Sequence, residues 1–203
     1  FLGLAFACIL GMFFGLLSVV KNKVCNIIAQ VFVFVIRGVP MIVLAFYVFF
    51  GIPYLLNTIL GIGNGFTLSA LQAGVICLAL NCGAYMAEII RSGLQAVDIG
   101  QTEAARSLGL NSRQTMRYVI VPQAFKIIVP ALGNEFVTLI KETSILSMVG
   151  IVEVTRRGTL WASQSFQSFP AYIGVAVVYL IMTLTLSRLV SYMERRMAQS
   201  DRS

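Results

Sequence analysis

GQTEAARSLGLNSRQTMRYVIVP, residues 100–122, is a polar stretch with three arginines inside an otherwise apolar chain. Thr102 is a residue type that caps helices, and Glu103 in the next turn suits the positive end of a helix dipole. Gly109 fits the left-handed position that ends a helix, and Asn111 starts a capping-box pattern. The stretch is therefore predicted to form a helix, a sharp glycine turn and a second helix.

Two interpretations of this stretch are open. Ala104 and Ala105 leave one face of the first helix nearly bare, and Arg106 lies at its rim. Such a helix is suited to dock into a groove on another protein. The alternative is a loop that serves membrane topology alone, because cytoplasmic loops between membrane helices are commonly short and basic.

The rest of the chain has the composition of a membrane protein. Of the 203 residues, 58% are hydrophobic and 11% are charged, and the mean hydropathy is +0.88. A soluble domain of this size would not bury so much apolar side chain, so most of the surface is expected to face lipid. The net charge of +7 then reports orientation in the membrane rather than affinity for nucleic acid.

Residue types needed for several kinds of chemistry are missing from the sequence. The chain has no histidine, and its four cysteines lack metal-ligand spacing. There is also no glycine-rich phosphate loop with its lysine. Hydrolytic catalysis, a metal site and nucleotide binding by this chain are therefore not expected.

Five apolar segments are expected to span the membrane as helices. They cover residues 1–20, 24–51, 69–90, 120–148 and 170–190. Basic residues gather at 21–23 and in 91–119. They also occur in or after the end of the last span, from Arg188 to Arg202, whereas the outside loop 52–68 has none. By the positive-inside rule the N-terminus is outside, the C-terminus is cytoplasmic, and residues 91–119 form a cytoplasmic loop.

The second expected span contains Arg37, Gly38 and Pro40. Pro40 cannot donate a hydrogen bond to the carbonyl group of Ile36, so a kink is predicted beside the only charge of the segment. A lipid-facing charge near mid-membrane is unfavourable. Arg37 therefore either snorkels to the cytoplasmic headgroups from a long tilted helix or clamps helices together inside the bundle.

The third expected span carries a polar stripe. Asn81, Tyr85 and Glu88 follow at steps of four and three and share one helix face. Because such a stripe is costly in lipid, we expect it to face the bundle or a watery substrate path. Helix packing accounts for Asn81 and Tyr85 equally well, and a pair with Arg91, three residues on, accounts for Glu88.

A second polar group closes the fourth expected span: Lys141, Glu142, Thr143 and Ser144. Pro122 and Pro130 are expected to break this helix, and transporters use the backbone groups that a broken helix frees for polar substrates. The group is therefore the first candidate for a substrate site. An internal ion pair at the outer mouth is the alternative.

These motifs occur in the order seen in one protein family. Glu103, Ala104, Ala105 and Gly109 resemble the EAA loop of permease subunits in bacterial ABC importers. Four further segments resemble recurrent motifs of the polar amino acid permeases: Arg37–Pro40, Gly83–Arg91, Pro122–Ala124 and Lys141–Ser144. The family usually has Asp where this chain has Glu142. The resemblance implies an all-α membrane protein with five spanning helices of type I importer architecture, which moves polar amino acids inward.

The resemblance also implies partners. An ABC ATPase subunit, which binds ATP and Mg, would receive the docking residues Glu103, Ala104, Ala105, Arg106 and Gly109. A second permease chain, identical or related, would complete the pathway, and an extracytoplasmic binding protein would deliver the amino acid. This chain would form a single transmembrane domain over residues 1–203 in the bacterial inner membrane, with no cofactor or catalytic residue of its own.

At the substrate site an amino acid presents one cation and one anion. Glu142 and Glu88 are expected to meet the ammonium group. Lys141, or the hydroxyl groups of Thr143 and Ser144, would meet the carboxylate.

Two other functions are compatible with the same residues. One is a secondary transporter driven by an ion gradient through Glu88, Glu135 or Glu142. Against it, no internal inverted repeat is visible, and five spans are few for such a protein. The other is a membrane scaffold that recruits a cytoplasmic partner and transports nothing.

Overall fold

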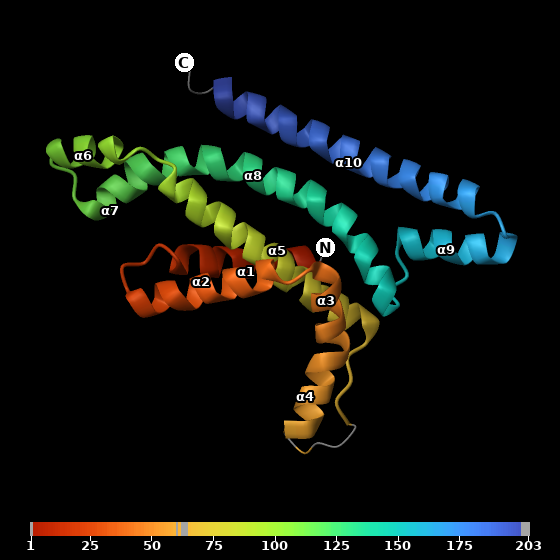
Figure 1. Ribbon diagram of the computed structural model, residues 1–203. Coiled ribbons are helices and arrows are strands. Elements are labelled where there is room, and N and C mark those ends of the chain that lie inside the picture. Colours follow the sequence, from red (N-terminus) through yellow and green to blue (C-terminus); the bar gives the residue numbers. More distant parts are fainter. Residues whose placement is uncertain (1, 60, 62–64, 200–203) are drawn as a thin grey trace.

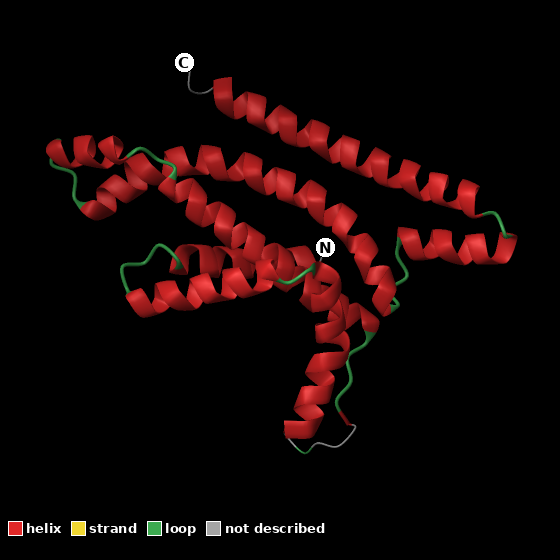
Figure 2. Cartoon of the chain, in the orientation of Figure 1, coloured by secondary structure: helices red, strands yellow, loops and turns green. Residues whose placement is uncertain are grey.

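The structure is a computed structural model that describes residues 2–59, 61 and 65–199. The first residue of the expected span 1–20 and Arg202 lie outside this part. Within it, every regular element is a helix (Figures 1 and 2). The elements are α1 (Leu2–Leu17), α2 (Lys23–Gly38), α3 (Met41–Phe46), the π turn η1 (Tyr47–Gly51), α4 (Ile52–Ile59), α5 (Ala70–Gln95), α6 (Ile99–Ser107), α7 (Ser112–Thr115), the π turn η3 (Met116–Ile120), α8 (Val121–Glu142), the 3-10 helix η4 (Thr143–Val149), α9 (Val154–Ser165) and α10 (Ser168–Gln199).

Several of these helices are suited to cross a membrane. Those long and apolar enough are Met41–Ile59, Ala70–Gln95, Ser112–Val149 and Ser168–Met197. α1 is apolar but shorter, with 16 residues, or about 24 Å. The chain is therefore an all-helical membrane protein. Of the five spans predicted, the described residues thus contain four helices long and apolar enough to cross a membrane, and one shorter apolar helix.

α1 is shorter than the predicted 1–20 because the chain turns after Leu17. The Ser18 hydroxyl group donates to the carbonyl group of Gly15 at 2.6 Å, and the Asn26 side chain donates to the carbonyl group of Ser18. Asn22 then caps α2 by accepting from the backbone N–H group of Val24 at 2.9 Å. These side-chain bonds satisfy the polar groups of two helix ends, so α1 and α2 form a tight hairpin.

The largest departure from the predicted helices is at Pro40. The predicted span 24–51 is not one kinked helix, because α2 ends before Val39, which is extended (φ −99°, ψ 128°). A proline disfavours the helical conformation in the residue before it, and Val39 is that residue. The chain changes direction here and continues as one helical arm, Met41–Ile59 (Figure 1). Residues 52–59, predicted as part of an outside loop, are therefore helical.

α5 is the centre of the molecule, and α1, α2 and α8 all pack against it (Figure 1). A capping box between Ser69 and Gln72 defines its start. The buried face of α1 repeats a small residue at every fourth position: Gly3, Ala7, Gly11 and Gly15. A Cβ atom at Gly11 would lie 2.5 Å from Cβ of Met86. The two helices thus approach too closely for any larger residue.

Pro122 and Pro130 do not break the fourth span, contrary to the prediction. Pro122 directly follows the π turn η3, whose altered hydrogen-bond pattern accommodates a missing N–H group, and Pro130 lies inside α8. Membrane helices tolerate an internal proline when neighbouring helices support them. α10 gives that support, because a Cβ atom at Gly133 would lie 2.7 Å from Val190. The α-helix ends only at Glu142, where η4 begins.

α9 and α10 form an antiparallel pair at one side of the molecule (Figure 1). Glu153 caps α9 by accepting from the backbone N–H groups of Thr155 and Arg156, each at 2.7 Å. Tyr179 of α10 donates its hydroxyl group to the same carboxylate at 2.7 Å. This one carboxylate therefore both starts α9 and joins it to α10.

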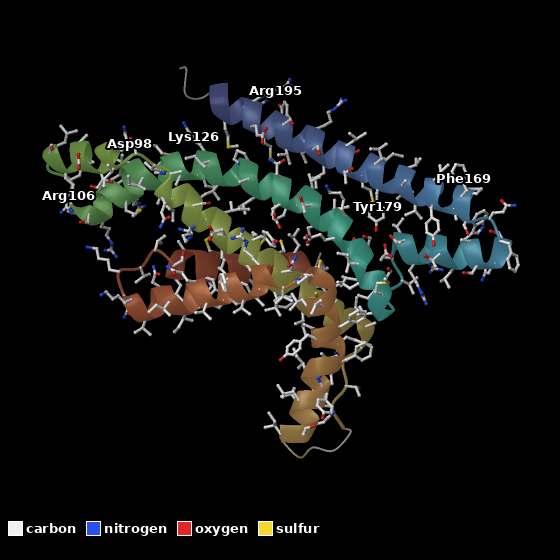
Figure 3. The ribbon with its side chains drawn as sticks, viewed as in Figure 1. Asp98, Arg106, Lys126, Phe169, Tyr179 and Arg195 are labelled. Atoms are coloured by element: carbon white, nitrogen blue, oxygen red, sulfur yellow. The ribbon has the colours of Figure 1, made fainter. Side chains whose placement is uncertain are left out.

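Charged side chains mark one end of the molecule. Figure 3 places Asp98, Arg106 and Lys126 at the end formed by α6, α7 and the start of α8, and Phe169 at the opposite end. The hairpin loop between α1 and α2, which carries Lys21, lies at the same end as α6 and α7 (Figure 1). Basic side chains therefore gather at the end formed by α6 and α7, whereas α9 at the opposite end carries Arg156 and Arg157.

Candidate functional site

α6, the first helix of the predicted docking stretch, begins one turn earlier than predicted. Asp98 is its cap, because Oδ1 of Asp98 accepts from the N–H group of Gly100 at 2.6 Å. Thr102, the predicted cap, lies inside the helix. Both are capping residue types, but Asp98 has the non-helical backbone (φ −55°, ψ 135°) that lets a side chain reach the free N–H groups. Upstream, α5 continues to Gln95, so the predicted loop starts with a helical turn.

The turn after α6 has the predicted conformation. Gly109 has a φ of 84°, and its N–H group and that of Leu110 donate to carbonyl groups of α6 at 3.0 and 3.1 Å. This pair of bonds is a Schellman motif, which a left-handed glycine completes. Asn111 and Gln114 then exchange hydrogen bonds of 2.9 and 3.0 Å as a capping box. The geometry between α6 and α7 is thus held by local bonds.

The predicted docking residues do not all face outward. Glu103, Ala104, Arg106 and Gly109 are exposed. Ala105, by contrast, is 4% exposed and packs inside the chain, so it anchors α6 rather than offering a contact. Two exposed apolar side chains, Ile99 and Leu108, lie at the ends of α6 and were missed by sequence reasoning. Their signal was two large apolar residues in an otherwise polar loop.

Glu142 and Asn81 connect the end of α8 to α5. Nδ2 of Asn81 donates to Oε2 of Glu142 at 2.9 Å, and Asn81 is only 3% exposed. Lys141 is exposed, and in the part of the chain that the structure describes no ion pair joins it to Glu142. The hydroxyl groups of Thr143 and Ser144 donate to carbonyl groups of their own helix, at 2.6 and 2.7 Å. Within this group, Glu142 is thus hydrogen-bonded to the central helix α5.

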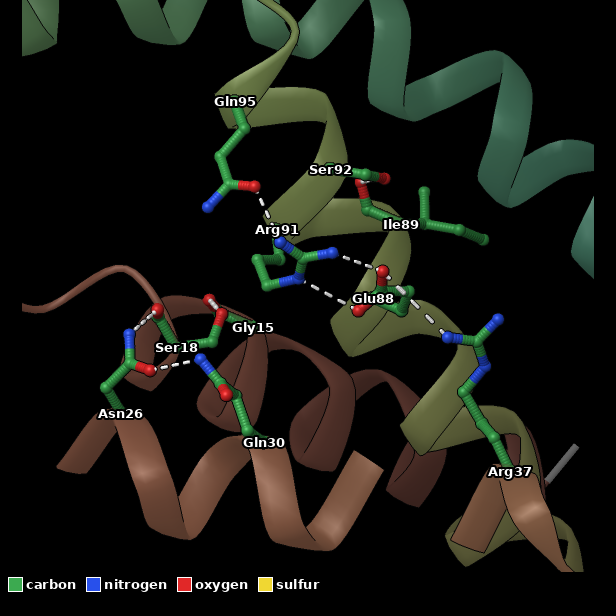
Figure 4. Close-up of polar contacts among 10 residues, drawn as sticks. All are labelled: Gly15, Ser18, Asn26, Gln30, Arg37, Glu88, Ile89, Arg91, Ser92 and Gln95. Carbon is green, nitrogen blue, oxygen red and sulfur yellow. Dashed lines mark hydrogen bonds and ion pairs between the residues drawn. The ribbon is translucent and has the colours of Figure 1, made fainter. Parts of the chain in front are cut away.

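Glu88 lies between two arginines (Figure 4). Arg91 donates from Nε to Oε2 at 2.9 Å and from Nη2 to Oε1 at 2.5 Å, as a two-bond fork. Nη1 of Arg37 lies 3.9 Å from the same Oε1, and its guanidinium group lies 4.9 Å from the centre of the Tyr85 ring. Gly38, beside Arg37, ends α2. The structure therefore brings Arg37 against α5, and the predicted alternative for Glu88, a pair with Arg91, is present.

The stripe of α5 runs inside the helix bundle. Asn81, Tyr85 and Glu88 lie on one face of α5, but Asn81 meets α8 whereas the other two meet Arg37 of α2. A cavity of about 360 Å³ adjoins the Glu88 end. Its polar lining consists of Ser18, Gln30, Arg37, Glu88 and Arg91. Ser18 and Gln30 were missed from the sequence, where they are single polar residues in apolar segments.

Known proteins are similar to this chain over nearly its whole length. The family described as binding-protein-dependent transport system inner membrane component matches residues 7–199. The chain belongs to this family. As a member, it is a multi-pass protein of the inner membrane that transports together with a separate binding protein, which agrees with its long apolar helices.

Relatives of this family member include two named for glutamine. The probable glutamine ABC transporter permease protein GlnM of Bacillus subtilis is 36% identical over 199 residues, which cover 98% of this chain and 88% of that protein. The glutamine transport system permease protein GlnP of Escherichia coli K12 is 36% identical over 196 residues, which cover 97% and 86%.

Two solved structures are similar in fold. A crystal structure of an amino acid ABC transporter with histidines has a TM-score of 0.87 and 42% identity, and the match covers 96% of this chain and 87% of that chain. An inward-facing structure of the MetNI methionine ABC transporter has a TM-score of 0.71 at 19% identity, covering 97% and 93%. The second similarity concerns the fold alone.

Proposed function

We propose that the chain is the permease subunit of an ATP-driven ABC importer that carries amino acids into the cell. Its family, its relatives GlnM and GlnP, and its similarity to an amino acid ABC transporter support this. The observation that carries the proposal is the polar stripe of α5, which links Glu142 to Glu88 inside an apolar bundle. Ionisable residues inside membrane bundles mark the routes of polar solutes.

The proposed topology has five spans, with α1 as the first. Its 16 residues are short for a core of about 30 Å, a mismatch that local thinning of the bilayer relieves. The basic end of the molecule, with Lys21 and Arg106, is cytoplasmic by the positive-inside rule. The start of the chain is then outside and its end is cytoplasmic.

α6 is proposed to dock into a cleft of the ATPase subunit. The exposed Glu103, Ala104 and Arg106 supply the contact, Ala105 anchors the helix, and the turn at Gly109 keeps its angle. ATP and Mg belong to the ATPase, and no catalytic group, cofactor or metal is assigned to this chain. A second permease chain, identical or related, completes the pathway, and an external binding protein delivers the amino acid.

Transport follows from movement of α6. Closure of two ATPase subunits around ATP pushes the two α6 helices together, tilts the spans and opens the path outward, and hydrolysis reverses the tilt. Gln123 at the start of α8 donates to Gln101 of α6 at 3.2 Å. This contact links the docking helix directly to the helix that ends at Glu142.

Glu142 is proposed to receive the ammonium group of the substrate. Its carboxylate accepts one bond, from Asn81, and no ion pair joins it within the described residues. Glu88 is less suited than predicted, because two arginines already occupy it. The hydroxyl groups of Thr143 and Ser144 already donate their protons to backbone carbonyl groups. They are therefore suited to accept a hydrogen bond from the substrate rather than to donate one.

The proposal is tested in liposomes that contain the purified permease–ATPase complex. ATP hydrolysis and uptake of labelled L-glutamine and L-histidine are followed with and without the binding protein. We expect the loaded binding protein to raise hydrolysis and the label to accumulate inside. Label that moves only under an imposed proton gradient would identify a secondary transporter, and an ATPase that binds without any uptake would identify a scaffold.

The coupling role of the turn is tested at Gly109. A β-branched Val is strained at a φ of 84°, by about 1–2 kcal/mol or more, whereas Asn tolerates this region. We expect Gly109→Val to insert normally and to hydrolyse ATP without uptake, and Gly109→Asn to retain coupled uptake. Both are measured in the same liposomes. Coupled uptake at the wild-type rate in Gly109→Val would contradict the role of the turn.

A further inference from the structure

We propose that Arg37 binds the carboxylate of the transported amino acid in the cavity between α1, α2 and α5, at a position on the path that is separate from Glu142, which does not line this cavity. The inference rests on the proposed function and extends it, because it assigns the substrate's anion to a residue that was predicted either to clamp helices together or to snorkel to the headgroups. The cavity measures about 360 Å³, within the range of about 300–1,000 Å³ usual for small-molecule sites. It is also half polar in character, with Ser18, Gln30 and three charged side chains in its wall.

The hydrogen-bond donors of the two arginines in this cavity are used very differently. In Arg91, Nε and Nη2 donate to Glu88, and Nη1 donates to Gln95 at 2.6 Å. Arg37 makes no hydrogen bond to any residue that the structure describes. Its one ion pair, of 3.9 Å, is to the Oε1 atom that Arg91 already holds at 2.5 Å (Figure 4).

The unfilled donors of Arg37 are open to a ligand. Its side chain is 37% exposed and lines the cavity, and Figure 4 shows its second terminal nitrogen directed away from Glu88. A guanidinium group has five N–H donors in a planar fork, and a carboxylate is the group that matches two of them at once. Leaving such a charge without hydrogen bonds inside a membrane protein is unfavourable. A substrate carboxylate would remove this cost.

No other group near the stripe is as well placed to bind the anion. The hydroxyl protons of Thr143 and Ser144 are given to backbone carbonyl groups, and Lys141 is exposed. Within the described part of the chain, Glu135 of α8 forms no ion pair with Arg37. The fork of Arg37 therefore stays available.

The position of Arg37 favours a transported solute over a lipid phosphate. Arg37 follows Lys23, at the start of α2, by fourteen residues, or about 21 Å of helix. On α5, Glu88 precedes the last residue, Gln95, by about 10 Å. Both distances place the pair away from the basic helix ends, and therefore away from the level of the lipid headgroups. Tyr85, which contacts Arg37, joins it to the stripe.

The inference is tested by ligand binding to the purified permease–ATPase complex in lipid nanodiscs, without the binding protein. The probe is L-glutamine or L-histidine, whichever the wild-type liposomes take up, and its carboxamide analogue, which lacks the anion. We expect wild type to prefer the free acid by roughly ten-fold or more. Arg37→Gln should lose this preference, and Arg37→Lys, which keeps the charge without the fork, should retain part of it.

The ratio of the affinities for the free acid and the carboxamide distinguishes a binding role of Arg37 from a structural one. A purely structural role would weaken the binding of both ligands alike. Arg188→Gln, an exposed arginine of α10, is the matched control and should behave as wild type. An unchanged preference for the acid in Arg37→Gln overturns the inference while the proposed function stands. A second result would also overturn the inference and leave the proposed function standing. In it, an anionic phospholipid co-purifies with wild type and is lost in Arg37→Gln, while amino acid binding is unchanged. Absence of ATP-driven uptake by wild type overturns the proposed function, and this inference with it.

Discussion

The two ends of the α5 stripe hold their carboxylates in opposite ways. Glu88 accepts a two-bond fork from Arg91 and lies 3.9 Å from Arg37. Glu142 accepts a single bond from Asn81 and has no ion pair within the described residues. A carboxylate inside a bundle is stabilised by a paired cation. The Glu88 end therefore works as a joint between α2 and α5, whereas the Glu142 end retains the capacity to bind a cation from outside the chain.

Disrupting the contact between Glu88 and its two arginines is expected to have the largest effect on stability. Glu88→Gln would leave Arg37 and Arg91 side by side without a counter-charge. Breaking such a pair costs about 2–3 kcal/mol, because all three side chains are partly exposed, at 25% to 37%. The midpoint of thermal unfolding of the purified complex should fall accordingly. A midpoint equal to that of wild type would mean that the joint is not structural.

The Glu142 end is expected to show its effect on transport instead. Glu142→Gln keeps the size of the side chain and an oxygen acceptor for Asn81, so unfolding should change by less than about 1 kcal/mol. The apparent KM of ATP-driven uptake should rise roughly ten-fold, because a charge-assisted bond to the ammonium group is lost. Glu194→Gln, on α10, is the control. Uptake with an unchanged KM would remove the difference between the two ends.

The smallest expected effects on the free energy of unfolding distinguish the charge of Arg91 from the geometry of its two bonds to Glu88. Arg91→Lys keeps the positive charge beside Glu88 but cannot form the fork, and it should cost about 1 kcal/mol. Gln95→Ala, which removes only the exposed bond to Arg91, should cost about 0.5 kcal/mol. Chemical unfolding of the complex measures both. If the order of the two variants were reversed, the fork would not be the main contact.

Features that depend on near neighbours were predicted well from the sequence. The left-handed Gly109 and the capping box at Asn111 are both present, because each is built from hydrogen bonds within a single helical turn. The shared face of Asn81 and Glu88 follows equally from helical periodicity. The cap of α6 was misplaced by one turn, since Asp98 and Thr102 are both capping residue types and only the backbone distinguishes them.

The three prolines show which features could not be predicted from the neighbouring residues alone. Pro40 ends α2, whereas Pro122 and Pro130 are contained in the fourth span. All three lie in apolar segments, so composition does not separate them. The π turn before Pro122 and the close contact of Gly133 with α10 make the difference, and the second of these is a contact between distant parts of the chain.

The sequence by itself determined that this chain is a helical membrane protein with a polar, tightly turned loop and a polar stripe. Hydropathy, capping and helical period act between residues close in the chain, so they can be read without a fold. Only the tertiary structure decided that Arg37 of α2 also lies beside Glu88, and that Glu142 is left to Asn81. Those partners depend on how each helix is rotated and where α2 ends, which the packing of distant segments sets.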